Sequence, residues 1–364
     1  MSTQRFPTPL SCTALTLFIL AATALPALSQ VEVANFIPSV QGDVSLQRHE
    51  VERPVVEGDQ LRGSDRLHVR SGSQVTIVCR NTAQYRLNSP GTYLVSTYCG
   101  AEPTRPPRPP GVSNVRMPSP IIISPVVTAL LSPDNLTIRW YPLPNATQYQ
   151  VTLTGQGVNW TAQVNRPQVT YTGSNPLQAG ATYRILIAAN GSSQQSGRLL
   201  STEFTVLPPA EVARVRQQLV RIQALQLEPD MEAIGLAHIY AGYQYSNYRL
   251  NQLAIDILQA RIDAGTSNGQ IYLLQADNCL TMGLPLIARE RYQQALILAQ
   301  NINHRERQAE SYLGLGEIAV RQTEYANAVG YLRAAQVLYQ ELGDREQVAE
   351  LQARIQRLSG ERVR

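Results

Sequence analysis

The side chains best able to catalyse a reaction or to hold a metal are scattered along this sequence. His49, His68, His238 and His304 follow the first 29 residues, and no two of them have the spacing of metal ligands. No cysteine cluster accompanies them. The sequence also lacks a Gly-x-Ser-x-Gly nucleophile motif, a Walker A loop and a dinucleotide-binding fingerprint. We therefore expect a protein that is not an enzyme and that uses no metal and no other cofactor.

Two cysteines are placed in the sequence so that they could form a structural disulfide. Cys79 ends the strand-like run QVTIVC and Cys99 ends the run TYLVSTYC, so the two runs could pair and bring the thiols together. A Cys79–Cys99 disulfide is one interpretation, and a pair of small buried thiols is the other. Cys279 has no obvious partner.

The N-terminus indicates export. Arg5 precedes an apolar run at residues 13–25, and small residues before Gln30 suit cleavage by signal peptidase. The run is shorter than the roughly 20 residues that span a bilayer, and no later segment is apolar enough to do so. We expect residues 1–29 to be a signal peptide, the alternative being an uncleaved anchor. A periplasmic or extracellular location follows, where disulfides persist.

Composition and charge exclude some functions. Of the 364 residues 43% are hydrophobic, which supports packed cores, and the formal net charge is +4. All 31 basic residues are arginine, and they form no basic stripe. Binding to nucleic acid is therefore not expected, because neutralising a phosphate backbone requires clustered positive charge.

Residues 31–100 alternate apolar and polar side chains between glycine-bearing turns, which predicts β-strands. The turns are Gly42-Asp43-Val44, the Gly-Asp turn within Glu57–Leu61, and Gly72-Ser73. This order resembles the FecR-like domain, a small β-sandwich module. A proline-dense segment at residues 101–119 then predicts a semi-rigid, extended linker.

Residues 120–207 again predict strands, and they resemble a fibronectin type III domain. That family has a core tryptophan, a tyrosine that opens the next strand, and a Leu-x-x-Gly-x-x-Tyr corner. The matching residues here are Trp140, Tyr149, Leu177, Gly180 and Tyr183. The resemblance implies a β-sandwich in which the Tyr183 hydroxyl bonds a nearby backbone group.

From residue 208 the apolar residues change to helical spacing, beginning with an amphipathic helix at Ala210–Leu227. Small residues recur 34 and then 40 positions apart, and a second set lies 12 residues further on. The two sets are Gly242, Ala276 and Gly316, and Ala254, Ala288 and Ala328. This pattern resembles the tetratricopeptide repeat, which implies stacked helix hairpins with terminal capping helices over residues 208–364. Cys279 is then expected to be a buried core thiol.

Tetratricopeptide arrays bind extended peptides or helices in a groove lined by the first helix of each repeat. Carrying those positions over gives Ile239, Tyr243, Asn247, Leu273, Asp277, Thr281, Leu313, Glu317 and Arg321. Asp277 and Glu317 would repel a terminal carboxylate. The expected partner is therefore a neutral or basic segment of a protein, anchored on Ile239, Leu273 and Leu313.

Together these features predict a multidomain protein with two all-β sandwiches followed by an all-α superhelix. Its domain mixture resembles that of exported bacterial, cyanobacterial-type proteins. We expect a non-catalytic scaffold or adaptor that acts through protein–protein interaction. The alternatives are an envelope signal sensor using the FecR-like domain, an accessory subunit of a peptidase, and carbohydrate binding through Trp160 and Tyr171. The sequence leaves the oligomeric state open.

Overall fold

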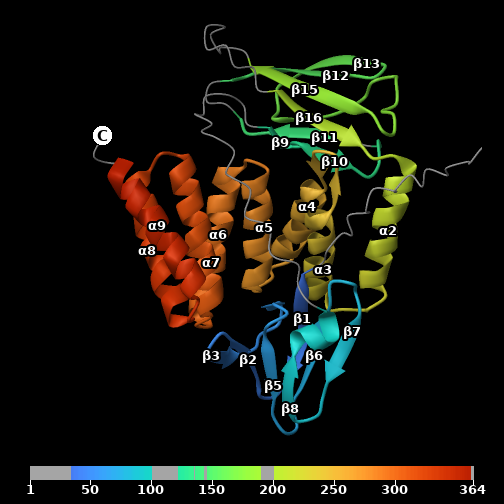
Figure 1. The fold of residues 1–364 in the computed structure, drawn as a ribbon. Helices are drawn as coiled ribbons and strands as arrows, with labels where there is room; N and C mark the ends of the chain where they lie inside the picture. Colours follow the sequence, from blue (N-terminus) through green and yellow to red (C-terminus); the bar gives the residue numbers. More distant parts are fainter. Residues whose placement is uncertain (1–33, 101–121, 135, 143–145, 190–200, 362–364) are drawn as a thin grey trace, which may run out of the picture. The chain divides into compact units, whose positions relative to one another are not determined.

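A computed structural model describes residues 34–100, 122–134, 136–142, 146–189 and 201–361 (Figure 1). The expected signal peptide at residues 1–29 and the expected linker at residues 101–119 lie outside these ranges. The described residues from 34 onward belong to one compact unit. Along the chain, a β-rich region comes first and a region of consecutive helices follows.

The first β region consists of two four-stranded antiparallel sheets. One has the order β4 (Gln60–Leu61), β1 (Asn35–Gln41), β6 (Gln74–Val78), β7 (Gln84–Leu87). The other has the order β3 (Val51–Pro54), β2 (Val44–Arg48), β5 (Arg66–Val69), β8 (Gly91–Leu94). Alternate side chains of both sheets meet in one core that includes Ile37, Leu46, Leu67 and Ile77. The region is therefore a sandwich, as its alternating sequence predicts.

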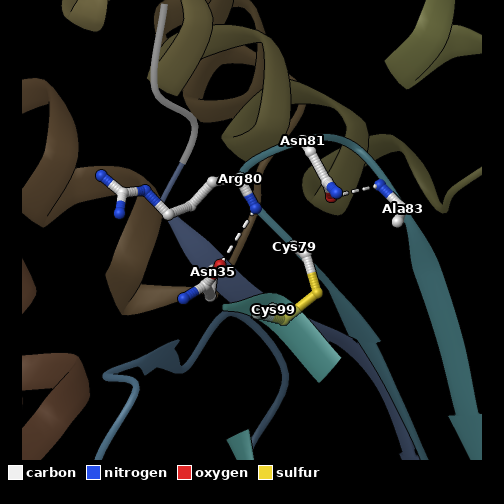
Figure 2. The surroundings of a disulfide bond; sticks show 6 residues. All are labelled: Asn35, Cys79, Arg80, Asn81, Ala83 and Cys99. Atoms are coloured by element: carbon white, nitrogen blue, oxygen red, sulfur yellow. Dashed lines mark hydrogen bonds between the residues drawn. A yellow bond between two sulfur atoms is a disulfide. The ribbon is translucent and has the colours of Figure 1, made fainter. Parts of the chain in front are cut away.

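Cys79 and Cys99 form a disulfide, with their Cα atoms 5.1 Å apart (Figure 2). The expected pairing of the two cysteine-bearing runs is wrong, because β6 and β8 lie in different sheets. Cys79 follows β6, whereas Cys99 ends a short helix, α1 (Val95–Cys99), that follows β8. The bond thus joins the ends of the two sheets. Closing a loop of this length, with the cysteines 20 positions apart in the sequence, contributes about 3 kcal/mol in the chain-entropy account.

The second β region packs a seven-stranded sheet against a three-stranded one. Most of the larger sheet is formed by β13 (Val158–Val164), β12 (Tyr149–Gly155), β15 (Thr182–Ala189), β16 (Ser201–Val206) and β10 (Thr128–Leu130). The smaller sheet has the order β14 (Gln168–Thr170), β11 (Thr137–Trp140), β9 (Ile122–Ser124). Trp140 and Tyr149 are buried between them, in edge-to-face contact. The Gln178 N–H donates to the Tyr183 hydroxyl at 2.7 Å, which confirms the backbone bond expected of that tyrosine.

The last two strands of the seven-stranded sheet come from the helical part of the chain. They are β18 (Tyr248–Arg249) and β17 (Gln244–Tyr245), a hairpin between the helices α3 (Pro229–Gly242) and α4 (Asn251–Asp263). β18 pairs in parallel with β10, and the Thr128 hydroxyl donates to the Arg249 carbonyl at 2.9 Å. Residues 208–364, for which stacked helix hairpins are expected, thus also contain a short β-hairpin. A main-chain connection joins the second sandwich to the helices.

The helices follow one another as antiparallel neighbours (Figure 1). They are α2 (Pro209–Gln223), α3 (Pro229–Gly242), α4 (Asn251–Asp263), α5 (Gly269–Thr281), α6 (Pro285–Asn301), α7 (Arg305–Arg321), α8 (Tyr325–Glu341) and α9 (Arg345–Glu361). The four helices from α6 onward have 17 residues each, against 13 for α4 and α5. The change of spacing from 34 to 40 residues thus accompanies longer helices. The turns between the helices stay short.

Small residues let these helices approach closely. Ala276, Ala288 and Ala328 are fully buried. A Cβ on Gly316 would lie 2.8 Å from a methyl carbon of Leu332, so this glycine has no room for a side chain. Gly242 does not share this role, because it is exposed at the end of α3.

Gly314 offers a direct test of this packing. A Cβ there would fall 2.2 Å from the ring of Tyr292, which is itself fully buried. Gly314→Ala should lower the free energy of unfolding by about 1–3 kcal/mol, because a packed ring has to move. Gly330→Ala in α8 is the matched control, since nothing lies within 4 Å of its Cβ position. That change should raise stability by up to about 1 kcal/mol. Urea denaturation of both variants measures the difference, and equal effects would contradict the packing.

Candidate functional site

The apolar anchors of the expected groove belong to the protein's own core. Ile239 is 0% exposed, Leu273 is 3% exposed and Leu313 is 7% exposed. Ile239 shares a buried cluster with Phe36 and Val78 of the first sandwich. Since these three side chains have almost no free surface in the described structure, their role as anchors for a partner stays a prediction.

The acidic groove positions have partners within the chain. Asp277 accepts a hydrogen bond from the Tyr292 hydroxyl at 2.5 Å. Glu317 forms an ion pair with Arg354 at 2.7 Å. Both carboxylates thus hold neighbouring helices together, and a ligand would have to displace those partners.

The remaining groove positions also differ from expectation. Tyr243 follows the end of α3, and Asn247 lies in the turn between β17 and β18, so neither lies on a repeat helix. Thr281 is exposed and donates to the Asp277 carbonyl one turn earlier in α5. Arg321 donates to the Leu280 carbonyl at 2.8 Å. The structure therefore does not bring the nine predicted residues together as one open surface.

A buried charge cluster joins the first sandwich to α7 instead, and Asp59 lies at its centre. Asp59 is 2% exposed and accepts from Arg53 at 2.6 Å and from the Val56 N–H at 3.1 Å. From the start of α7, His304 Nε2 donates to it at 2.7 Å and Arg307 donates at 3.1 Å. One carboxylate is thus shared by two parts of the chain about 245 residues apart.

Further ion pairs extend this cluster. Glu306 accepts from Arg53 at 2.9 Å and from Arg48, and Arg48 also donates to Asp65 at 2.9 Å and 2.6 Å. Arg62 lies 3.5 Å from the carboxylate of Asp344, just before α9. The arginines of one module therefore neutralise acids of the other.

The local backbone conformation positions Asp59 and His304. Gly58 has φ of +84°, which lets the chain turn sharply and presents Asp59 to the helices. His304 caps α7, because its Nδ1 accepts from the Arg307 N–H at 3.3 Å. Since Nδ1 is an acceptor, the proton is on Nε2, which donates to Asp59. His304 is thus neutral and oriented at both nitrogens.

Burial and charge together set the protonation states. Burial by itself would raise the pKa of Asp59, but Arg53, His304 and Arg307 hold that pKa far below its ordinary value. Burial lowers the pKa of His304, although its bond to Asp59 opposes the effect. Burial would also raise the pKa of Glu306, and Arg48 and Arg53 lower it. The carboxylates are therefore ionised and His304 is neutral near pH 7.

A cavity of about 630 Å³ adjoins this cluster, and we call it the junction cavity. Its lining includes Asn35, Arg80, His238, Gln270, Arg307 and Glu346. Three buried nitrogens of these residues have no hydrogen-bond partner among the described residues: Asn35 Nδ2, His238 Nε2 and Arg307 Nε. Such atoms are costly to leave unpaired. In the described structure, these three unpaired nitrogens are the features that most clearly indicate a site for a ligand.

The side chain of Asn35 shows how one of these nitrogens is positioned. Its Oδ1 accepts from the Arg80 N–H at 3.0 Å, beside the disulfide (Figure 2). This bond fixes the amide, and Nδ2 stays buried without an acceptor among the described residues. Burial lowers the pKa of His238 to about 4, so its ring is neutral. Two residues that line the cavity, Asn35 and Arg307, therefore each carry a buried N–H donor that an acceptor oxygen of a ligand would satisfy.

The described residues include no set of three or more His, Cys, Asp or Glu residues arranged to hold a metal ion. Cys279 is buried, which confirms its expected place in the core, and burial raises the pKa of its thiol to about 12. Such a thiol is protonated and unreactive near neutral pH.

Comparison with known proteins assigns no relationship. No protein-family model matches the chain, and no curated protein matches it. Across the parts of the chain that the structure describes, no helix has the length and apolar character needed to cross a membrane.

Removing the central carboxylate should be strongly destabilising. Asp59→Ala should lower the free energy of unfolding by about 3–5 kcal/mol, because it leaves Arg307 buried without its paired carboxylate and Arg53 with Glu306 alone. Glu203→Ala is the control: it breaks an exposed ion pair with Arg184, and it should cost less than about 1 kcal/mol. Chemical denaturation monitored by circular dichroism measures both. Similar small losses in the two variants would show that the buried cluster contributes little.

The cavity histidine predicts a pH dependence. Because the folded pKa of His238 is about 4, below its ordinary 6.5, the unfolded chain takes up a proton first as pH falls. The stability that this group contributes is present above pH 6.5 and is lost toward pH 4. Between pH 7 and pH 5 the loss should be about 2 kcal/mol. His238→Phe should remove this part of the slope in denaturation curves, and an unchanged slope would exclude His238 as its source.

Proposed function

We propose that this protein is an exported, non-catalytic adaptor that binds a segment of another protein in the junction cavity. The observation that carries the proposal is that three residues lining the cavity, Asn35, His238 and Arg307, each have one buried nitrogen without a hydrogen-bond partner among the described residues. A cavity of about 630 Å³ is within the range that protein ligand sites span. The proposed role is therefore the adaptor role that the sequence predicts. The proposed binding site is the junction cavity and not the predicted groove.

Other features support this proposal at the level of modules. The antiparallel helices from α3 onward fit the tetratricopeptide resemblance, and the corner at Tyr183 fits the fibronectin type III resemblance. Both are families of binding or scaffolding modules. The Cys79–Cys99 disulfide is compatible with the proposed export.

The chemistry of the cavity favours a neutral or basic segment. Main-chain carbonyl oxygens of a peptide would accept from Asn35 Nδ2 and Arg307 Nε. Acidic side chains also line the cavity, including Glu310 and the exposed Glu346. These favour a basic side chain beside the carbonyls and disfavour an acidic one.

Asn35→Asp is the sharpest test of the site. It keeps an acceptor for the Arg80 N–H and replaces the cavity donor Nδ2 by an oxygen. Peptides selected from a random library against the full chain should be neutral or basic. Their affinity should fall at least about tenfold in the variant, because an acceptor then faces an acceptor. Calorimetric titration measures the change.

A second pair of variants tests the position independently of Asn35. Glu346→Trp places a large ring at the cavity lining and should block the selected peptide. Glu350→Trp, one helical turn later on the same exposed face of α9, should leave binding unchanged. Full binding by both Asn35→Asp and Glu346→Trp would overturn the proposed site.

A further inference from the structure

The outermost strand of the seven-stranded sheet is unusual among the sheet edges of this chain. In the described structure β13 (Val158–Val164) pairs with β12 on one side and with no strand on the other. It has seven residues, VNWTAQV, with no charge, no proline and no glycine. A long, uncharged edge of this kind is a template for pairing with another strand.

The other edges lack this combination. β17 and β4 have two residues each, and β9 and β14 have three. β3 carries a glutamate, an arginine and a proline, β7 carries an arginine, and β8 has four residues and begins with glycine. These are the features by which natural edges avoid pairing. Only β13 among the described edges is left open over a long stretch.

The hairpin register shows which backbone groups of β13 face outward. A two-residue turn joins β12 to β13, and Gly155 pairs directly with Val158 across it. A pair that closes such a turn exchanges both of its main-chain hydrogen bonds, and hydrogen-bonded pairs then alternate along the ladder. Val158, Trp160, Ala162 and Val164 therefore bond to β12. The N–H and C=O groups of Asn159, Thr161 and Gln163 point away from the sheet.

We propose that two copies of this chain pair through β13, antiparallel and centred on Thr161. In this register Thr161 faces Thr161 of the second copy, and Asn159 faces Gln163. These are the residues whose backbone groups point outward, so each pair exchanges two main-chain hydrogen bonds. The seven-stranded sheets of the two copies become one continuous sheet. The inference does not depend on the proposed adaptor function.

The side chains of β13 complement themselves in this register. On the exposed face an amide lies opposite an amide and a threonine lies opposite a threonine, which are favourable cross-strand pairs. On the other face Trp160 lies opposite Ala162, and Val158 lies opposite Val164. Trp160 is held by an edge-to-face contact with Tyr171, their ring centres 5.3 Å apart. No like charges meet. This self-complementarity favours a second copy over an unrelated peptide.

Sedimentation velocity of the full chain tests the proposal. The parent should be a dimer at micromolar concentration. Thr161→Lys should be monomeric, because two lysines would meet on the two-fold axis. Thr154→Lys is the matched control, an exposed threonine in the same hairpin but on β12, and it should remain dimeric.

A charge-swap experiment separates a lost interface from a damaged fold. Thr161→Glu alone should also be monomeric, and an equimolar mixture with Thr161→Lys should recover the dimer. Circular dichroism of the single variants should match that of the parent. A monomeric parent, including one that binds an extended peptide along β13, would overturn the proposal. So would a dimer that persists in Thr161→Lys, or a mixture that stays monomeric.

Discussion

The structure depends on one buried carboxylate. Removing Asp59 from water costs several kcal/mol unless charge and hydrogen bonds replace the lost solvation. Its own module supplies Arg53 and one backbone N–H, and α7 supplies His304 and Arg307. Neither the turn that bears Asp59 nor the start of α7 satisfies its charges alone. The first sandwich and the helices are therefore expected to fold as one cooperative unit.

Residues of this buried cluster also line the junction cavity. The pairs made by Arg307 and Asn35 fix those side chains, yet one nitrogen of each stays unpaired. A ligand that supplied acceptor oxygens would complete the hydrogen bonding that the fold leaves unfinished. The second sandwich is joined by different means: a strand pairing between β10 and β18 that involves the backbone. Buried charge and an apolar cluster thus join the first sandwich to the helices, and a main-chain strand pairing contributes to the second junction.

The sequence predicts features that depend on neighbours nearby in the chain. Trp140, Tyr183 and Cys279 lie where the sequence predicts. The spacing of apolar residues within one strand or helix determines which side chains face the core. It does not predict that Phe36 and Ile239 belong to one buried cluster, since a repeat pattern shows which face of a helix is apolar and not what packs on that face. Nor could it pair Asp59 with His304, about 245 residues away. In the sequence, only the Gly-Asp turn and the isolated histidine pointed to this contact. Each of these features usually has another explanation.

A double-mutant cycle between Asp59 and Arg307 tests the central claim most directly. Asp59→Ala, Arg307→Ala and the double variant would be compared with the parent by chemical denaturation of the full chain. If the buried pair joins the two modules, the coupling energy should exceed about 1.5 kcal/mol, because the second change removes a charge that the first has already left unpaired. Additive effects, agreeing to within about 0.5 kcal/mol, would contradict the account.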